Sequence, residues 1–483
     1  MCNNSNCVRT RFAPSPTGFM HVGNLRTALY ACLLAHSSKG KFILRIEDTD
    51  QARYVDGAVD VIYATLKAAN LIHDEGPDVG GDFGPYIQSE RKPLYAEYAK
   101  KLVETGHAYY CFCEKCEDET EGAGNSDPAD DPCRAMDPAE AQKLVDAGKS
   151  CVIRQKIDRS GSTTFTDSVF GEITIENKVL DDQILLKSDG MPTYNFANVI
   201  DDHLMAITHV VRGSEYLSST PKYNLLYKAF GWDIPTYVHL PLIMGRNADG
   251  EVAKLSKRHG SVSFENLIAD GYLAEAIVNY IALLGWSSKS DREIFEFSEL
   301  EELFSLSGLN KSPAVFDYDK LKWMNAEYIR KLSPEEFAAR AKSFAQVENT
   351  PLEAKWDMLA ALLQQRTELL TEIPGKIAFL HEQPEYDAEM FNNKKSKCTP
   401  EIAKEILLEM REAFSGMEIS AQAVTDLLTA CAEKRGVKLG QPMWAVRIAL
   451  SGTPVTPGGP GEIMELLGKE ESLRRIDNAL AKL

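Results

Sequence analysis

The stretch that decides the fold is residues 11–24, RFAPSPTGFMHVGN. A short strand is predicted over residues 7–12, and the prolines after it stiffen a loop that leads into a helix over residues 25–35. The N-terminus of such a helix offers free N–H groups and the positive end of the helix dipole, which together suit a phosphate. The stretch therefore predicts an anion site between a strand and a helix.

Candidate contacts to that anion come from the same loop. Gly18 and Gly23 let a ligand approach the backbone closely, and His21 could donate a hydrogen bond to phosphate oxygens. For the His-x-Gly fragment alone, a tight strand–helix turn capped by Asn24 is the better explanation. A second observation is needed to decide between a phosphate site and a turn.

That second observation is the pentapeptide KLSKR at residues 254–258, which lies between Gly250 and Gly260. Three cations within five residues on a loop suit a polyphosphate leaving group, because negative charge develops there as diphosphate departs. The alternative is an ordinary solvated basic loop, which explains most basic pentapeptides.

Strand and helix signals alternate through the front of the chain. Residues 41–46 read as a buried strand, and residues 57–70 and 93–104 as helices. This order predicts an α/β fold with a doubly wound parallel, Rossmann-like sheet. The signals return over residues 194–237, where we expect the sheet to be completed.

An insertion is predicted between the two parts of the sheet. Residues 114–140 hold ten acidic residues and two basic ones, which is typical of a solvated segment. Asp137 should cap a short helix, and residues 165–186 have the alternation of an antiparallel hairpin. Beyond Gly260 the helical signals dominate, with starts at Ser333 and Thr399, so an all-helical C-terminal half is predicted.

Composition excludes several classes of protein. The chain has 483 residues, a net charge of −18 and 44% hydrophobic residues, which is typical of a globular protein of several domains and not of a disordered one. No apolar stretch is long enough to span a membrane. The polar N-terminus lacks the apolar core of a secretory signal, so a cytoplasmic location is expected.

Together the two loops change the interpretation. HVGN at residues 21–24 resembles the HIGH motif, and KLSKR the KMSKS motif, of class I aminoacyl-tRNA synthetases, in the order and separation of that class. Asn24 and Arg258 depart from the motifs, but neither departure puts the class in doubt. Further segments resemble bacterial glutamyl-tRNA synthetases over essentially the whole chain: RFAPSPTG from Arg11, RIEDTD at 45–50, QSER at 88–91, PTY at 192–194, VRGSE at 211–215 and RIALSG at 447–452.

The resemblance implies a division into domains. Residues 1–105 and 186–245 would form the two halves of the catalytic domain, and residues 106–185 a connective insertion that binds the acceptor end of tRNA. Residues 246–330 would contact the tRNA stem and carry the KLSKR loop. Residues 331–483 would form a helical anticodon-binding domain.

The resemblance also implies an activity, which is ATP-dependent activation of glutamate followed by transfer to tRNA(Glu). His21, Lys254 and Lys257 would stabilise the charge that develops on the phosphates. Mg²⁺ would arrive with ATP. The implied ATP contacts are Pro14, His21, Gly23, Asn24, Lys254, Ser256 and Lys257.

Glutamate needs cations for two carboxylates and an acceptor for its ammonium group. By resemblance, Arg11 and Arg212 would meet the carboxylates and Glu47 the ammonium group. The remaining implied contacts are Ala13, Ser15, Tyr194 and Asn198. Taken singly, Glu47 could cap a strand, Arg212 could form a surface ion pair and Tyr194 could be core. A pocket built from such charges rejects uncharged analogues, so no editing domain is expected.

Four cysteines lie close together in the predicted insertion: Cys111, Cys113, Cys116 and Cys133. Four thiols are enough for a tetrahedral structural Zn²⁺. Some relatives bind zinc here through a Cys-x-Cys pair and a later Cys-x-His. This chain has Cys133-Arg134-Ala135 instead, so Cys116 would have to replace the histidine; the alternative is a degenerate site with free thiols.

The expected partners are tRNA(Glu) and L-glutamate, with a monomer as the family norm; the sequence leaves open whether tRNA(Gln) is charged as well. Rival families fit less of the chain. Glutaminyl-tRNA synthetases end in β-barrels, and glutamyl transferases that act on a modified tRNA base resemble only the front half. Nucleotidylyltransferases lack RIEDTD and the long tRNA-binding region. A non-catalytic RNA-binding paralogue would be expected to lose His21, Lys254 and Lys257.

Overall fold

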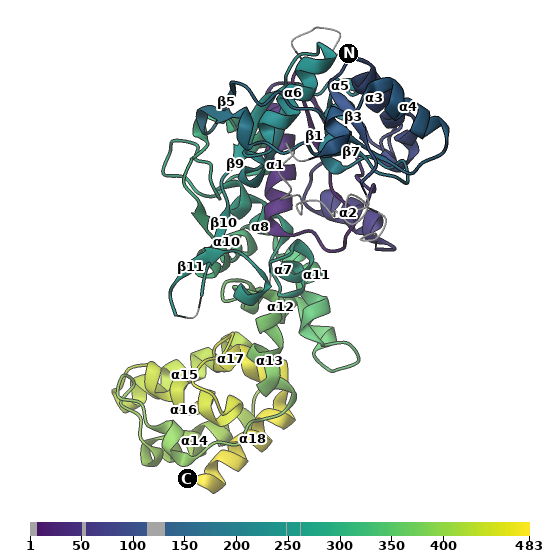
Figure 1. Cartoon of the computed structure of the whole chain (residues 1–483). Coiled ribbons are helices and arrows are strands. Elements are labelled where there is room, and N and C mark those ends of the chain that lie inside the picture. The colour runs from purple at the N-terminus through teal and green to yellow at the C-terminus, as the bar shows by residue number, and fades with distance from the viewer. Residues whose placement is uncertain (1–6, 51–54, 114–130, 248, 261) are drawn as a thin grey trace. The chain divides into compact units, whose positions relative to one another are not determined.

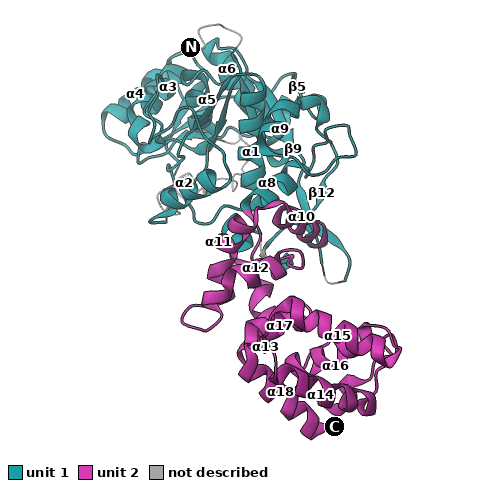
Figure 2. Cartoon of the chain, turned by 180° about the vertical axis from the view of Figure 1, so that it is seen from behind, with its two compact units in different colours: residues 1–268, 274–318 teal, residues 269–273, 319–483 magenta. Residues whose placement is uncertain are grey.

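The computed structural model describes residues 7–50, 55–113, 131–247, 249–260 and 262–483, and for Lys257 the backbone alone. The chain divides into two compact units (Figure 2). Unit 1 contains residues 1–268 and 274–318, and unit 2 contains residues 269–273 and 319–483. Within the part of the chain that the structure describes, no helix is long and apolar enough to cross a membrane.

Unit 1 begins with the predicted strand–helix–strand segment (Figure 1). β1 (Arg9–Phe12) and β2 (Lys41–Leu44) pair in parallel, and α1 (Val22–Ser37) connects them. Eleven of the sixteen residues of α1 are buried, so this helix lies inside the unit and not on its surface. The prediction of a parallel α/β start is confirmed.

A second parallel pair lies beside the first. β8 (His209–Gly213) pairs with β9 (Thr236–Leu240), and α6 (Thr220–Phe230) lies between them in the chain. The amide of Thr208, at the start of β8, donates to the carbonyl of Arg9 over 3.0 Å, which places β8 next to β1. The front of the chain is therefore a mixed α/β region with parallel strand pairs.

The predicted insertion contains two antiparallel arrangements. β5 (Ser162–Asp167) and β6 (Gly171–Glu176) form the expected hairpin, and β5 also pairs in parallel with β9. The hairpin is shorter than predicted, because β7 (Ile184–Leu186) joins another sheet. That sheet consists of β3 (Ala108–Cys111), β4 (Val152–Gln155) and β7.

Four helices pack around these strands. Asp137 caps the short helix α4 as predicted, because its carboxylate accepts from the amides of Ala139 and Glu140. Tyr95, Phe196 and Leu226 lie in one core cluster of the unit and are fully buried. The helices are α2 (Ala58–Ala68), α3 (Lys92–Glu104), α4 (Pro138–Asp146) and α5 (Tyr194–Leu204).

The C-terminal half is largely helical, but the prediction that it is all helical is wrong in its first part. β10 (Ile243–Arg246) pairs with β11 (Val252–Lys254) in a hairpin and with β12 (Ala314–Val315) in parallel. β12 has only two residues, too few for a visible alternation, and its partner lies about 70 residues earlier in the chain. The helices of this segment are α7 (Phe264–Ala269), α8 (Ala274–Ala282) and α9 (Phe297–Leu303).

Unit 2 contains helices and no β-strand among its described residues. Ser333 forms the predicted capping box with Glu336, and Thr399 accepts from the amide of Ile402. The helices, the first of which begins one residue before the unit, are α10 (Tyr318–Lys331), α11 (Pro334–Ala345), α12 (Trp356–Gln364), α13 (Ile373–His381), α14 (Pro400–Ser415), α15 (Ala421–Arg435), α16 (Gly440–Ser451), α17 (Pro460–Leu467) and α18 (Lys469–Lys482).

Helices α15 and α17 of unit 2 approach each other closely at Gly461, and this predicts a stability difference between two glycines. A Cβ added at Gly461 would lie 2.4 Å from the carbonyl oxygen of Ala421, whereas a Cβ at Gly375 in α13 would meet nothing within 4 Å. We expect Gly461→Ala to destabilise the protein by about 1–3 kcal/mol through overpacking. Gly375→Ala should be neutral or stabilising by about 0.5 kcal/mol, because alanine favours helix.

Guanidinium unfolding followed by circular dichroism measures both variants, and hydrogen exchange of α15 and α17 peptides localises the effect. Equal stability of the two variants would contradict the role given to the close approach at Gly461.

Candidate active site

Backbone pairing brings the two phosphate-loop candidates together. His21 forms an antiparallel bridge with Ser263, five residues after the KLSKR segment, and the amide of Val22 donates to the carbonyl of Val262 over 2.8 Å. Lys254 at the end of β11 is near enough for its charge to act on His21. The two loops therefore face one site within unit 1.

A carboxylate on α7 reinforces this pairing. One oxygen of Glu265 accepts from the amide of Met20 over 3.1 Å, and the other accepts from the hydroxyl of Thr65 on α2 over 2.5 Å. Glu265 thus joins the loop before α1 to α2 and α7. The position of the loop before α1 is therefore set by its contacts with α2 and α7 as well as by its own prolines.

His21 occupies the N-cap of α1. Its Nδ1 accepts from the amide of Gly23 over 3.0 Å, so the ring proton of the neutral imidazole lies on Nε2. Burial lowers the pKa of His21, and the charge of Lys254 lowers it further. The turn capped by Asn24 is therefore wrong as a description, because His21 is the capping residue and Asn24 is exposed. His21 is a neutral donor at pH 7.

The basic loop is held by a histidine that follows it. Nδ1 of His259 accepts from the amide of Ser256 over 3.0 Å, and its Nε2 lies 2.9 Å from Oδ1 of Asn247. The side chain of Lys254 is exposed, and that of Ser256 is half-buried. Lys257 begins the short helix η7 (Lys257–His259), but its side chain lies outside the part of the chain that the structure describes.

A buried charge cluster lies at the ends of β1 and β2. Arg45 is fully buried and reaches Asp202 over 2.7 Å and Glu47 over 2.9 Å. Arg11 donates to Asp202 over 3.0 Å. Three arginines and three carboxylates balance each other, which offsets the cost of burying each charge: Arg11, Arg45, Arg91, Glu47, Asp201 and Asp202.

Glu47 is the carboxyl of this cluster whose pKa is raised. Burial raises its pKa to about 7, although Arg45 opposes the shift. Its amide donates to the carbonyl of Pro14 over 3.0 Å, which ties it to the loop before α1. A nearby ammonium group would lower this pKa and restore full negative charge, so the position suits the recognition of an amine.

Arg212 on β8 is buried but differs from the other arginines of the site. Among the described residues, no carboxylate oxygen lies within 4.0 Å of its guanidinium. Its Nε donates to His239 over 3.0 Å and its Nη2 to Thr220 over 2.9 Å. Three tyrosine rings surround it at 4.7–5.3 Å: Tyr216, Tyr223 and Tyr237. Such a guanidinium suits an incoming carboxylate.

The remaining residues predicted to contact glutamate lie on α5 and in the loop before α1. Tyr194 lies against Tyr216, with ring centroids 5.4 Å apart, and its carbonyl accepts from Nδ2 of the buried Asn198 over 2.9 Å. Glu47 and Arg212 both act on the pKa of Tyr194, which places the three near one another. Ala13 is half-buried and Ser15 is exposed in the loop before α1.

Three of the four predicted cysteines come together, and the side chain of Asp131 lies beside them. The donor atoms of Cys111, Cys113, Asp131 and Cys133 all lie within 4.8 Å of one another, and Cys116 lies outside the described residues. Tetrahedral Zn–S bonds of about 2.3 Å would place donor atoms about 3.8 Å apart. The Sγ atoms of Cys113 and Cys133 are 3.6 Å apart. The geometry fits a structural zinc ion.

Comparison with known proteins decides the family. The profile of tRNA synthetases class I (E and Q), catalytic domain, matches residues 7–323, and that of the anticodon binding domain matches residues 336–480. The glutamate–tRNA ligase of Clostridium novyi is 54% identical over 481 residues, covering 99% of this chain and 98% of the relative. The chain belongs to the glutamate–tRNA ligase family.

Other relatives agree with this assignment. The glutamate–tRNA ligase of Clostridium acetobutylicum is 52% identical and covers 99% of both chains. A crystal structure of a glutamate tRNA ligase from Elizabethkingia meningosepticum, in complex with its amino acid, is 34% identical, covers 99% of both chains and has a TM-score of 0.85. The fold of this glutamate–tRNA ligase family member is thus shared over its whole length.

Sequence reasoning missed several residues of this site. Arg45 belongs to the quoted RIEDTD segment but was not assigned a role, and Asp201-Asp202 interrupts an otherwise apolar helix face. Adjacent carboxylates in a buried helix are an unusual signal that could have identified the cluster. His239 and Asp167 had no comparable signal, since each stands alone among uncharged residues in its strand.

The anticodon-binding match covers most of unit 2, where two arginines lie close together. Nε of Arg447 is buried without a hydrogen-bond partner among the described residues. Burial lowers the pKa of Arg447, and the charge of Arg366 lowers it further. Arg366 is exposed and donates to the carbonyl of Thr456 over 2.6 Å, and Val455 beside it is 75% exposed. Two unpaired cations near an exposed loop suit an anionic partner.

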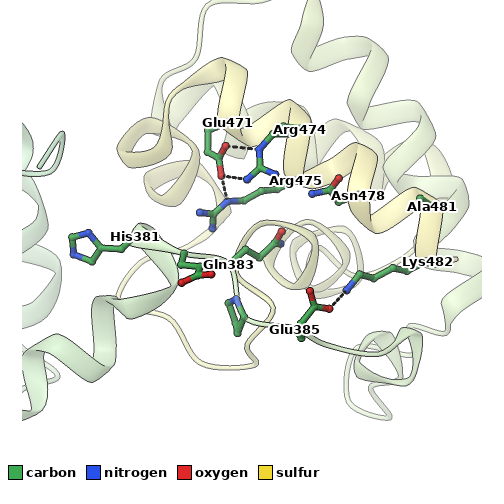
Figure 3. Close-up of a pocket in the computed structure, with 11 residues that line it drawn as sticks. His381, Gln383, Glu385, Glu471, Arg474, Arg475, Asn478, Ala481 and Lys482 are labelled. Atoms are coloured by element: carbon green, nitrogen blue, oxygen red, sulfur yellow. Dashed lines mark hydrogen bonds and ion pairs between the residues drawn. The ribbon is translucent and has the colours of Figure 1, made fainter.

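A separate pocket of unit 2 is a weaker candidate. It has a volume of about 510 Å³, and its charged side chains are largely paired with one another (Figure 3). Glu471 binds Arg474 and Arg475, and Lys482 binds Glu385. The pocket therefore offers few free charges to a ligand.

The contact between the two loops predicts a measurable titration. We expect His21 to titrate below the ordinary histidine pKa of 6.5, and Lys254→Met to raise its pKa, because removal of a nearby positive charge favours the imidazolium form. NMR of histidine-labelled protein measures the shift. Lys101→Met on α3 is the matched control and should leave the His21 titration unchanged. If Lys254→Met and Lys101→Met gave the same His21 curve, the two loops would not share a site.

Proposed function

We propose that the protein activates glutamate with ATP to form glutamyl-adenylate and diphosphate, and then transfers the glutamyl group to the 3′-terminal adenosine of tRNA(Glu). The observation that carries this proposal is the bridge between His21 and Ser263, which unites two phosphate loops in a chain related over its full length to glutamate–tRNA ligases. The pocket chemistry beside those loops supports the choice of amino acid.

In the first step a carboxylate oxygen of glutamate attacks the α-phosphorus of ATP, and the bond to the bridging oxygen of the β-phosphate breaks. No protein nucleophile is required, so catalysis rests on positioning and on charge stabilisation. His21 would donate from Nε2 to a phosphate oxygen, and Lys254 and Lys257 would stabilise the departing diphosphate. Mg²⁺ bound to ATP would neutralise part of the phosphate charge.

Further ATP contacts would come from the loop before α1 and from the basic loop. Pro14, Gly23 and Asn24 flank His21, and Ser256 lies between the two lysines. The free amides at the start of α1 suit the phosphates.

The amino acid would bind between the charge cluster and the tyrosines. Arg212 would hold the side-chain carboxylate, and Glu47 would accept from the α-ammonium group. Nε of Arg11 already donates to Asp202 and Nη1 to the carbonyl of Val211 over 3.3 Å, so fewer of its donors are open than the sequence implies. Its remaining donors would contact the α-carboxylate. The other proposed contacts are Ala13, Ser15, Tyr194 and Asn198.

In the second step the terminal ribose hydroxyl of tRNA attacks the acyl carbon, AMP leaves, and the hydroxyl proton passes to AMP or solvent. We assign residues 106–185 to the acceptor end, residues 246–330 to the stem and residues 331–483 to the anticodon. Within the last segment Arg366 and Arg447 are the best candidates to meet the RNA, because neither forms an ion pair among the described residues.

Several broader properties belong to the same proposal. The parallel pairs β1–β2 and β8–β9 support a Rossmann-like, doubly wound catalytic domain made from residues 1–105 and 186–245. A cytoplasmic monomer is the natural form for such a ligase. Charging of tRNA(Gln) with glutamate depends on anticodon contacts that remain to be assigned by experiment.

A structural Zn²⁺ forms part of the proposal, with Cys111, Cys113, Asp131 and Cys133 as ligands. The hydroxyl of Tyr109 donates to Asp131 over 2.9 Å and would orient the carboxylate toward the ion. When bound, the ion would join β3 to η4 (Pro132–Ala135) and stabilise the insertion.

The function is tested by charging separate tRNA(Glu) and tRNA(Gln) transcripts with radiolabelled glutamate. We expect ATP-dependent charging of tRNA(Glu), and a rise of about 100-fold in the glutamate KM for Arg212→Ala, because a buried charge partner is lost. The tRNA KM should be nearly unchanged. Arg159→Ala, on an exposed segment of the insertion, is the control. Absence of charging in the unaltered protein would refute the function, and an unchanged glutamate KM would remove Arg212 from the pocket.

Metal analysis tests the zinc site. We expect about one zinc per chain in the purified protein, and its loss in Asp131→Ala and Cys113→Ser, because each removes one of four ligands. Cys151→Ser changes a thiol of the same region outside the cluster and should retain zinc. Loss of zinc in Cys116→Ser but not in Asp131→Ala would assign Cys116 as the fourth ligand instead.

A further inference from the structure

The buried guanidinium of Arg212 needs a counter-charge but has none in direct contact. Two of its five N–H donors are used, Nε by His239 and Nη2 by Thr220. Its Nη1 makes no hydrogen bond with any residue that the structure describes. An isolated buried cation is costly, so something must stabilise it before the substrate arrives.

His239 lies between Arg212 and a buried carboxylate, that of Asp167. Nδ1 of His239 is 2.7 Å from Oδ2 of Asp167, and the same oxygen accepts from the His239 amide over 3.1 Å. Nε2 of His239 accepts from Arg212, so the ring proton must lie on Nδ1 and point to the carboxylate. Asp167, His239 and Arg212 form one hydrogen-bonded chain.

Both inner members of this chain are firmly held. His239 is fully buried and Asp167 is 2% exposed. Oδ1 of Asp167 accepts from the amides of Val169 and Phe170 over 2.9 Å each, in the turn between β5 and β6. Burial lowers the pKa of His239, and although Asp167 opposes this shift the charge of Arg212 adds to it, so the imidazole stays neutral.

We propose that Asp167 and His239 are positioning residues that aim the Arg212 guanidinium at the substrate side chain and thereby set the preference for a carboxylate over an amide. A carboxylate in direct contact with Arg212 would satisfy it and occupy the donors that the substrate needs. An imidazole in between transmits part of the carboxylate's stabilisation and leaves the other donors open. The inference rests on the proposed function, in which Arg212 holds the carboxylate of glutamate.

The anchoring carboxylate comes from the β5–β6 hairpin of the predicted insertion and not from the catalytic strands. Asp167 pairs in register with Tyr237 of β9, two residues before His239, so the sheet itself brings the carboxylate behind the imidazole. The hairpin is therefore part of the amino-acid pocket.

Steady-state charging of tRNA(Glu) tests the role of the chain of three residues. We expect His239→Ala and Asp167→Asn to raise the glutamate KM about tenfold or more, and to lower the ratio of kcat/KM for glutamate over glutamine by a similar factor. The KM values for ATP and tRNA and the kcat should change less than about threefold, because only amino-acid binding is affected.

A conservative substitution at His239 distinguishes a positioning role from a role in packing alone. His239→Gln should retain most of the wild-type glutamate KM, because its amide oxygen can accept from Arg212 while its amide nitrogen donates to Asp167. His209→Gln on β8 is the matched control, since this half-buried histidine bonds Thr208 and not Arg212. Thermal melting by circular dichroism establishes that each variant folds, and if His239→Ala does not, the isosteric Asp167→Asn decides.

The proposal is overturned if His239→Gln behaves like His239→Ala, or if all three KM values rise together. Suppose that the wild-type protein charges tRNA(Glu) but the His239 variants have an unchanged glutamate KM. That result refutes this inference and leaves the proposed function intact. A wild-type protein that does not charge tRNA(Glu) refutes the proposed function first.

Discussion

The site depends on a backbone contact between two segments about 240 residues apart in the chain. His21 and Ser263 form a backbone bridge, and the amide of Val22 donates to the carbonyl of Val262. The loop before α1 and the loop after β11 therefore lie side by side. Main-chain groups make this contact, and it is therefore insensitive to most side-chain changes in either loop. The neutral imidazole of His21 and the ammonium group of Lys254 are therefore held near one another by the fold, which is the preorganisation that the proposed phosphate chemistry needs.

A second constraint is the balance of buried charge beside the phosphate loops. Arg11, Arg45 and Arg91 are each paired with a carboxylate of that cluster, so these arginines have counter-charges without a ligand. Arg212 is balanced differently, because Asp167 reaches it only through a neutral imidazole. The first arrangement supports the backbone around the pocket. The second arrangement leaves the positive charge of Arg212 available to a ligand. It also explains why this arginine can be buried without a carboxylate in direct contact.

Local signals made much of the fold predictable, and long-range contacts made the rest unpredictable. The capping box at Ser333, the N-cap at Thr399 and the strand–helix–strand start follow from neighbours in sequence, and the structure confirms them. The partner of Arg11 is Asp202, 191 residues away, and no spacing rule could have paired them. The same limit explains the missed strand β12 and the unforeseen place of Asp131 beside three of the cysteines.

The resemblance supplied the proposed substrate contacts but not the residues proposed to position them, and there is a physical reason for the difference. A contact residue must present one type of group to a fixed ligand, so its identity is tied to the chemistry and is visible in a motif. A positioning residue such as His239 needs only to complete a hydrogen-bonded chain, and its meaning appears only once β5 and β9 are paired. Because that pairing draws Asp167 from the insertion, the boundary drawn in sequence between insertion and catalytic domain does not coincide with the boundary of the amino-acid pocket.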